Sequence, residues 1–333
     1  MDIIKRLTKT KEVGIFLVLV ALSLLFSILS PQFFKVSNFF NISKQIATLG
    51  ICSVGFAFVL ITGGIDLSLG YQISLINIVC AYMMTEMGVN WVVAVLLSIL
   101  IGTFIGFING MIITKTGVAP LIVTLSMMQI LNGFSYLISK GLPMFGFPTD
   151  FSYLGQGTLF NSIPVSLIFL IVIIIVGVFI LNKTYFGRYF YAIGCNEEAS
   201  RVSGVNTVRI RLLVYSLCGF FTAIGAILVL SRLNSAQSAT GAGFEFDVLT
   251  ACVLGGVSTN GGKGSVVGAI IGVLIVGVLD NGLVLLNITE YIQLVIKGTI
   301  LMIAVIYDTM SRNRSERIKR MKSINLENTN IEV

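Results

Sequence analysis

Three charged side chains stand inside long apolar stretches of this 333-residue chain and are its first candidates for chemistry. Asp66 lies in the stretch "LITGGIDLSLG", and Asp280 and Lys297 lie in two later apolar stretches. A carboxylate in such a setting can cap a helix, pair with a cation, contact a polar solute or relay a proton. The role of each group therefore depends on the solvent in which the chain folds.

Several other kinds of chemistry are excluded by the sequence. It contains no His, which rules out imidazole metal sites and Ser–His triads. The five Cys form no C-x-x-C pair, so we interpret them as small buried hydrophobic residues rather than disulfides or zinc ligands. The stretch "GGVSTNGGKGS" fails the phosphate-loop pattern, because Val257 and Gly264 stand where Gly and Ser or Thr are needed. We expect no catalytic residue, no metal and no cofactor, and hence no enzyme.

The composition is that of a membrane protein. Hydrophobic residues make up 56% of the chain and charged residues only 11%, with a mean hydropathy of +0.96. Soluble domains are typically ~45–50% apolar and ~25% charged. We therefore predict an all-α fold, a polytopic transmembrane helix bundle of about ten spans with broken, Gly-rich helices. The predicted spans are 13–30, 46–62, 68–86, 91–113, 118–138, 163–181, 210–231, 247–257, 265–286 and 292–308.

The distribution of basic residues predicts the orientation of these spans. With a cytoplasmic N-terminus, 17 of the 22 Lys and Arg residues fall in cytoplasmic segments and four in external ones. This bias follows the positive-inside rule and places both termini in the cytoplasm. The cytoplasmic segments would be 1–12, 114–117, 182–211, 258–264 and 309–333.

The chain thus divides into a cytoplasmic N-terminal segment (1–12), a transmembrane domain (13–308) and a basic cytoplasmic tail (309–333). We expect the tail to lie against anionic lipid head groups. The net charge of +7 then requires no nucleic-acid partner.

Asp66 has three possible roles. Gly63 and Gly64 allow the chain to bend, and Asp66 and Ser68 can then cap a helix that begins near Leu67. Alternatively, Asp66 faces a solute or a gate. A proton relay is the third possibility, although no acidic or His partner lies near it in the sequence.

Asp280 and Lys297 lie at similar depth on two consecutive antiparallel spans, so we predict a structural ion pair between them; a role in transport is the alternative. Amides within spans fit a pathway for a neutral polyhydroxyl solute, but they also join helices to one another. These amides are Asn77, Asn109, Gln129, Asn132 and Asn281.

Gly-rich bends occur at corresponding places in two halves of the chain. "LITGGIDLSLG" is echoed by "LGGVSTNGGKGSVVG" at residues 254–268, and each bend joins one apolar stretch to the next. Such paired breaks suggest a duplicated architecture and are typical of transporters.

Three stretches closely resemble the ribose-type permease family of ABC importers. They are "TGGIDLSLG", "FGRYFYAIGCNEEASRVSGVNTVRIRLLVYSLCGFFTAIGAI" and "SRLNSAQSATGAGFEFDVLTACVLGGVSTNGGKGSVVGAIIGVLIVGVLDNGL". The resemblance implies a bacterial plasma-membrane permease subunit that pairs with a second copy or a homologue. It also implies a cytosolic ATPase and an extracytoplasmic sugar-binding protein as partners.

The resemblance assigns roles to particular residues. The pattern N-E-x-A-x-x-S-G marks a coupling helix for the ATPase within the loop 182–211. Its candidate residues are Asn196, Glu197, Glu198, Ala199, Arg201, Ser203 and Gly204. Candidates for translocation or gating are Gly63, Gly64, Asp66, Ser68, Asn109 and Asn281. The solute stays open among ribose, other monosaccharides and the furanosyl signal autoinducer-2, and an ion-coupled carrier that uses Asp66 and Asp280 is the rival mechanism.

Overall fold

The computed structural model describes residues 11–160 and 162–331, and the side chains of residues 14–160 and 162–310. The described residues form thirteen helices and one small hairpin, whose two strands have two residues each. This confirms the all-α prediction. The helices are α2 (Lys11–Leu29), α3 (Val36–Ile61), α4 (Leu69–Thr85), α5 (Trp91–Thr116), α6 (Pro120–Ser139), α7 (Thr149–Gln156), α8 (Val165–Lys183), α9 (Tyr185–Cys195), α10 (Glu197–Val202), α11 (Thr207–Leu233), α12 (Phe244–Leu254), α13 (Val266–Leu285) and α14 (Glu290–Ile331). Strands β1 (Thr158–Leu159) and β2 (Ile163–Pro164) pair antiparallel between α7 and α8, with Thr158 opposite Pro164.

Within the described residues, seven helices are long and apolar enough to cross a membrane: α3, α5, α6, α8, α11, α13 and the part of α14 from Glu290 to Met310. The apolar part of α2 (Gly14–Leu29) and the whole of α4 are shorter. The chain is therefore a multi-pass membrane protein. The count of ten spans stays a prediction, because α12 has only 11 residues.

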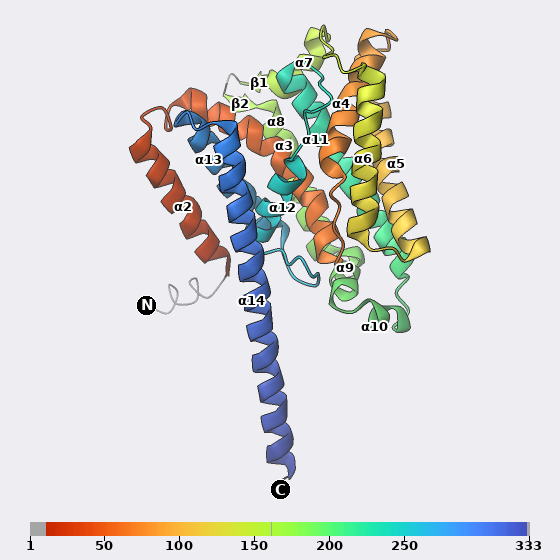
Figure 1. Cartoon of the computed structure of the whole chain (residues 1–333), viewed down its shortest axis with the longest axis vertical. Helices are drawn as coiled ribbons and strands as arrows, with labels where there is room; N and C mark the ends of the chain where they lie inside the picture. Colours follow the sequence, from red (N-terminus) through yellow and green to blue (C-terminus); the bar gives the residue numbers. More distant parts are fainter. Residues whose placement is uncertain (1–10, 161, 332–333) are drawn as a thin grey trace.

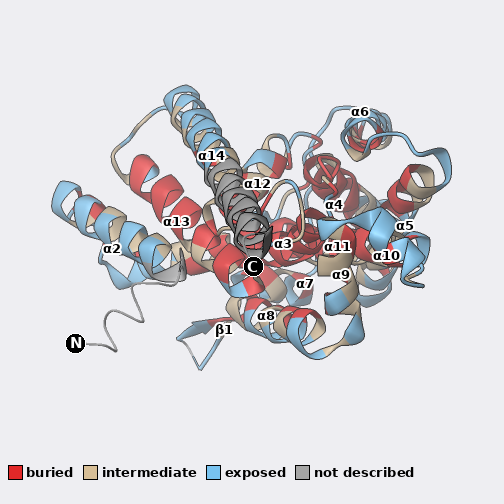
Figure 2. Ribbon diagram, turned by 90° about the horizontal axis from the view of Figure 1, so that it is seen from below, coloured by how far each residue is buried: buried red, intermediate tan, exposed pale blue. Residues whose placement is uncertain are grey.

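Helix α3 forms the centre of the bundle. It packs against α11, α13, α8 and α12, and most of its residues are buried. The outer helices each rest on one or two neighbours: α5 on α11 and α4, α6 on α4, α2 on α13, and α14 on α12. Figure 2 shows the resulting contrast between the buried centre and the exposed faces of α2, α6 and α14. Since exposed apolar faces are stable only in lipid or against a partner, this arrangement suits a membrane.

The helix contacts agree with the duplication that the Gly-rich bends suggested. Helix α13 packs on α3 as α5 packs on α11, and α12 contacts α14 as α4 contacts α6. Helices α4 and α12 are the shorter members of these sets. Two short helices, each entered or left through a Gly-rich bend, therefore lie between longer ones.

The segments that the charge rule assigned to the cytoplasm gather at one end of the bundle. Helix α10, the turn between α5 and α6, and the loop between α12 and α13 lie at this end, toward which α14 also runs (Figure 1). Helix α7 and the hairpin lie at the opposite end. We call these the inner end and the outer end. Their orientation in the cell stays a prediction, and residues 1–10 of the predicted N-terminal segment lie outside the described residues.

Several predicted boundaries were wrong. Helix α3 begins at Val36 rather than residue 46, because polar residues in its first turns find partners: Asn38 bonds Asn281, and Lys44 Nζ donates to Gln156 O at 2.9 Å. Helix α4 (Leu69–Thr85), by contrast, matches the predicted span 68–86 to within one residue at each end. Helix α12 is shifted by three residues toward the N-terminus, and α14 continues beyond residue 308. The short helices α7 and α9 were not foreseen.

Candidate coupling and translocation site

Asp66 lies in a cluster of hydrogen-bonded polar groups at the bend between α3 and α4. Its Oδ1 accepts hydrogen bonds from Ser68 N at 3.0 Å and Ser68 Oγ at 2.5 Å. Asn109 Nδ2 on α5 donates to Ser68 Oγ at 2.9 Å and lies 3.5 Å from Asp66 Oδ1. All three side chains are fully buried. In this conformation Asp66 therefore holds the turn before α4 and is buried away from solvent. Ser68 occupies the N-cap position but makes no side-chain cap hydrogen bond, so the prediction that Ser68 caps α4 was wrong.

The bend itself requires glycine. Gly63 has a φ of +77°, in the left-handed region that side chains rarely adopt. At Gly64, an added Cβ would lie 2.5 Å from Tyr215 Oη, whose ring on α11 fills the space. Tyr215 Oη also donates to Ile65 O at 3.4 Å. The bend is thus held against both α5 and α11.

The end of α9 joins the two Gly-rich bends at the inner end. Gly262 N donates to Ile61 O at 2.8 Å, which ties the α12–α13 loop to the end of α3. Tyr191 Oη donates to Gly264 O of the same loop at 2.7 Å. Gly194 packs so closely that an added Cβ would collide with Ile61 O and Gly262 N. We call these five residues the joint.

Helix α10 follows the joint directly and carries the predicted coupling residues. Asn196 caps it, accepting from Ala199 N at 2.9 Å, and Ser203 Oγ donates to Ala199 O at 2.8 Å. Gly204 ends the turn with a φ of +88°. Val202 is 79% exposed at the tip, where it presents an apolar surface.

The charged residues of α10 divide into two groups. Glu197 pairs with Arg211 of α11 at 2.5 Å, so it fixes α10 to its own chain. Glu198 pairs with Arg201 at 2.7 Å, and both are largely exposed. The Glu198 carboxylate raises the pKa of the Arg201 guanidinium above its ordinary value through this hydrogen bond. Glu198, Arg201 and Val202 are thus the side chains best placed to meet a partner.

Lys297 on α14 contacts Asp280 on α13, with 3.0 Å between Nζ and Oδ1. Its Nζ also donates to Asp247 Oδ2 on α12 at 2.9 Å. The sequence had placed Asp247 at the outer boundary of a span and did not foresee this contact. One lysine thereby joins three neighbouring helices.

Asn281 makes a reciprocal amide pair with Asn38 on α3. Asn38 Nδ2 donates to Asn281 Oδ1 at 2.9 Å, and Asn281 Nδ2 donates to Asn38 Oδ1 at 2.8 Å. Both amides are buried. Asn281 thus joins α13 to α3 in this conformation, in line with the helix-joining role of amides.

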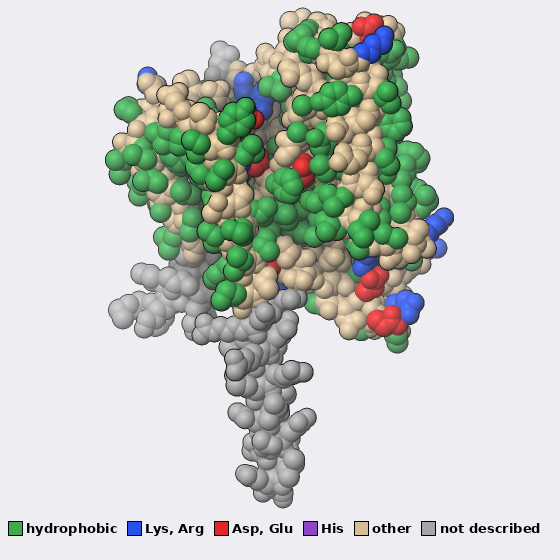
Figure 3. Space-filling model, viewed as in Figure 1, with side chains coloured by type: hydrophobic (Ala, Val, Ile, Leu, Met, Phe, Trp, Pro, Cys, Tyr) green, Lys and Arg blue, Asp and Glu red, His purple; other side chains and the backbone are tan. Residues whose placement is uncertain are grey.

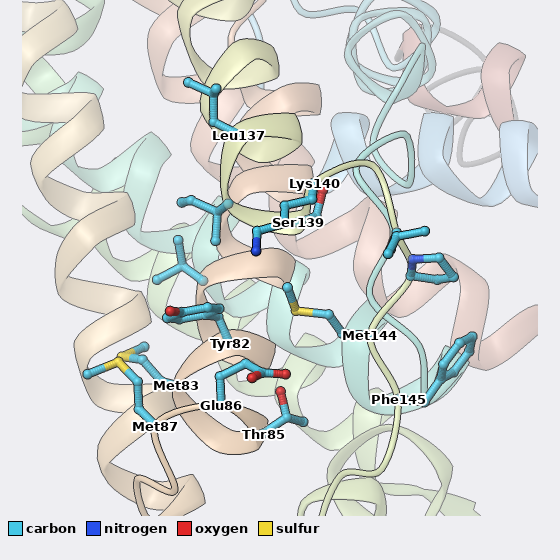
Figure 4. Close-up of a pocket in the computed structure, with 14 residues that line it drawn as sticks. Tyr82, Met83, Thr85, Glu86, Met87, Leu137, Ser139, Lys140, Met144 and Phe145 are labelled. Carbon is cyan, nitrogen blue, oxygen red and sulfur yellow. The ribbon is translucent and has the colours of Figure 1, made fainter.

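A cavity of about 790 Å³ opens at the outer end, between the ends of α4 and α6 and the segment that follows α6. Figure 4 shows Glu86 and Lys140 beside the aromatic and sulfur side chains that line it. Among them are Tyr82, Met144 and Phe145. No sequence pattern singled out these residues, because they converge from segments about 60 positions apart.

The sequence profile of the family described as "Branched-chain amino acid transport system / permease component" matches residues 38–305. The chain belongs to this family. The ribose import permease protein of Bacillus subtilis (strain 168) is 41% identical over 300 residues, covering 90% of this chain and 92% of that relative. The ribose import permease protein of Escherichia coli (strain K12) is 39% identical over 306 residues, covering 91% and 94%.

A third similar protein is the galactose/methyl galactoside import permease protein of Escherichia coli (strain K12), which is 37% identical over 327 residues, covering 93% of this chain and 97% of that relative. No solved structure matches the permease significantly. These relatives confirm the resemblance to ribose-type permeases and agree with a permease that is not itself an enzyme. All five cysteines are free; four are buried as predicted, but Cys195 at the end of α9 is exposed, so the prediction of burial was wrong for that residue.

Proposed function

We propose that this permease is the membrane subunit of an ATP-driven importer for ribose. The supporting observation is its 39–41% identity, over about nine tenths of the chain, to two proteins named as ribose import permeases. The third relative is named for galactose, so a related monosaccharide, or another small furanosyl solute such as autoinducer-2, is the nearest alternative. The permease does no covalent chemistry; it provides a path and two conformations.

The energy would come from a cytosolic ATPase that receives the tip of α10. Because Glu197 and Asn196 fix α10 to the end of α9 and to α11, a push on the tip moves these parts together. The joint carries that motion to the ends of α3 and of the α12–α13 loop. The bend at Asp66 follows residue 61 directly. The inner end of α3 and this bend would therefore shift together with α9 and the α12–α13 loop. Differential affinity of the ATPase for two permease conformations then drives the cycle.

The other proposed partners follow from the exposed surfaces. A second permease copy would cover part of the apolar surface left by α6 and α14, and lipid would cover the rest. An extracytoplasmic sugar-binding protein would deliver the solute at the outer end, on the side of the Glu86 and Lys140 cavity. The N- and C-termini would then be cytoplasmic, in a bacterial plasma membrane.

The rival mechanism is an ion-coupled carrier that uses Asp66 and Asp280. The contacts of Asp66 with Ser68 and of Asp280 with Lys297 disfavour it, since both carboxylates already have partners inside the protein. It predicts uptake that stops when the ion gradient is dissipated while ATP remains.

The test is solute uptake by cells that lack other ribose transporters. These cells express the permease together with the ATPase and binding protein encoded beside it. We expect uptake of labelled ribose that unlabelled ribose abolishes, that leucine leaves intact, and that depends on ATP rather than on an ionophore-sensitive gradient. Competition by leucine would indicate that the permease imports amino acids instead. Loss of uptake with ionophore at constant ATP would support the ion-coupled carrier.

A further inference from the structure

The Lys297 triad (Asp247, Asp280 and Lys297) lies well inside the apolar layer. Lys297 is seven residues beyond Glu290, which begins α14, and so lies ~10 Å below the outer end of that helix at ~1.5 Å per residue. The span Glu290–Met310 has 21 residues, so the triad lies roughly a third of the way through. Charged side chains at such depth are costly unless they pair with one another or face water.

The triad is not sealed inside the protein. The exposed fractions of the Lys297 and Asp247 side chains are 23% and 20%, and that of Asp280 is 11%. Figure 3 shows acidic side chains in a recess of the otherwise hydrophobic face on which α14 lies. Ionised groups in a membrane face the bundle interior or water rather than lipid tails, so we expect the exposed parts of these side chains to face water.

The elements around the triad are those that form solute sites in transporters. Asp247 lies in the first turn of α12, an 11-residue helix that begins inside the bundle after the Gly-rich segment "TGAG". Gly241 N in that segment donates to Ser74 Oγ of α4 at 3.0 Å. Discontinuous helices that begin near the middle of the membrane line solute sites in many transporters. Phe246, next to Asp247, is 47% exposed and adds an aromatic surface.

The chemistry of the triad suits hydroxyl groups. Lys297 uses one oxygen of each carboxylate, which leaves the second oxygens as acceptors, and the ammonium has a third N–H to donate. A sugar hydroxyl both donates and accepts, so neighbouring hydroxyls can bond a carboxylate and the lysine together. A metal cation is disfavoured by the ammonium already between the carboxylates, and the described residues contain no group of three acidic, Cys or His side chains placed to hold one.

We propose that Asp247, Asp280 and Lys297 form a hydroxyl-binding site for the sugar on the translocation pathway. This inference rests on the proposed function. It assigns the triad a role in solute contact beyond that of a structural ion pair, and it makes the face between α12 and α14 the wall of the pathway.

Labelling from water tests the inference on the assembled importer in proteoliposomes. Asp247→Cys is made in a Cys195→Ser background, because the remaining cysteines are buried. Val295→Cys is the matched control: Val295 lies two residues before Lys297 and is 68% exposed, but on the apolar surface of α14. A membrane-impermeant thiosulfonate reagent is added outside, with or without D-ribose and its binding protein.

We expect the thiol introduced by Asp247→Cys to react, and ribose to suppress that reaction, while the control thiol stays unmodified. No reaction at position 247 would show that the recess is not aqueous and would overturn the inference. Reaction that ribose does not suppress, in an importer that still takes up ribose, would overturn the sugar contact alone. An importer that takes up no ribose even with the native residues would instead refute the proposed function.

A second variant covers the case in which Asp247→Cys does not assemble. Asp247→Asn keeps the side-chain shape and the acceptor oxygen near Lys297. We expect ribose uptake to fall about tenfold or more, the usual effect of losing a charge-assisted hydrogen bond, while the loaded binding protein still stimulates ATP hydrolysis. Uptake at the native rate would overturn the inference.

Discussion

The hydrogen bond between Tyr191 and the Gly264 carbonyl is the most direct test of how α10 moves the transmembrane helices. Tyr191→Phe removes one hydroxyl and leaves the ring in place. The bond is 2.7 Å long, and burial raises the pKa of the Tyr191 hydroxyl, so it remains a donor at physiological pH. A hydrogen bond of this kind contributes ~0.5–1.5 kcal/mol, which corresponds to a factor of about 2 to 12 in an equilibrium.

If the bond carries motion from α9 to the α12–α13 loop, its loss separates ATP hydrolysis from helix movement. We expect the ribose transported per ATP hydrolysed, measured in proteoliposomes with the ATPase and binding protein, to fall by up to that factor. ATP hydrolysis itself should continue, since the tip of α10 is unchanged. The measurement requires labelled ribose and phosphate release from the same vesicles.

Tyr189→Phe is the matched control. Tyr189 lies on the same helix, two residues earlier, and its ring packs against Tyr185 rather than the loop. This variant should keep the native ratio of ribose to ATP. Equal ratios in Tyr191→Phe and the native permease would refute the transmission argument, and so would equal losses in both variants.

Three further outcomes are expected. Gly194→Ala should be more severe than loss of the hydroxyl, because its Cβ forces backbone segments of the joint apart; overpacking typically costs ~1–3 kcal/mol, so thermal unfolding in detergent should shift to lower temperature along with the loss of uptake. Ala substitutions of Asn38 and Asn281, alone and together, should give a coupling energy of ~0.6–1.7 kcal/mol in a double-mutant cycle of unfolding, and additive effects would contradict the amide pair. Asp66→Asn retains the oxygen that accepts from Ser68, so ribose uptake should persist; complete loss in a folded variant would indicate that the charge itself takes part.

The sequence was sufficient for features that depend on local pattern or helix length. The positions of Asp280 and Lys297 along two consecutive helices placed them at the same depth, and the structure contains the ion pair. The short helix α10 was expected from the resemblance of residues 196–204 to the family pattern, and not from spacing alone. The first of these arguments uses only the constant rise of a helix.

Contacts between distant segments could not be predicted in this way. Asp247 follows a small polar stretch that is typical of an external loop, yet the chain turns back into the bundle there and places it on Lys297. Asn38 lowers the hydropathy of its segment, but its partner 243 positions away allows α3 to extend over it. Gly194 is one glycine among 34, and only the approach of two other backbone segments reveals why it must be small.

Cys195 is a site at which a spectroscopic label could report on the joint. Its sulfur lies 3.8 Å from Gly262 O and is exposed, whereas the other four thiols are buried. A small fluorine-bearing reagent would therefore mark this residue in the native chain, with no cysteine removed beforehand. The fluorine resonance of that label would report the separation of α9 from the α12–α13 loop during ATP turnover. The rate of that movement could thus be measured without any substitution in the chain.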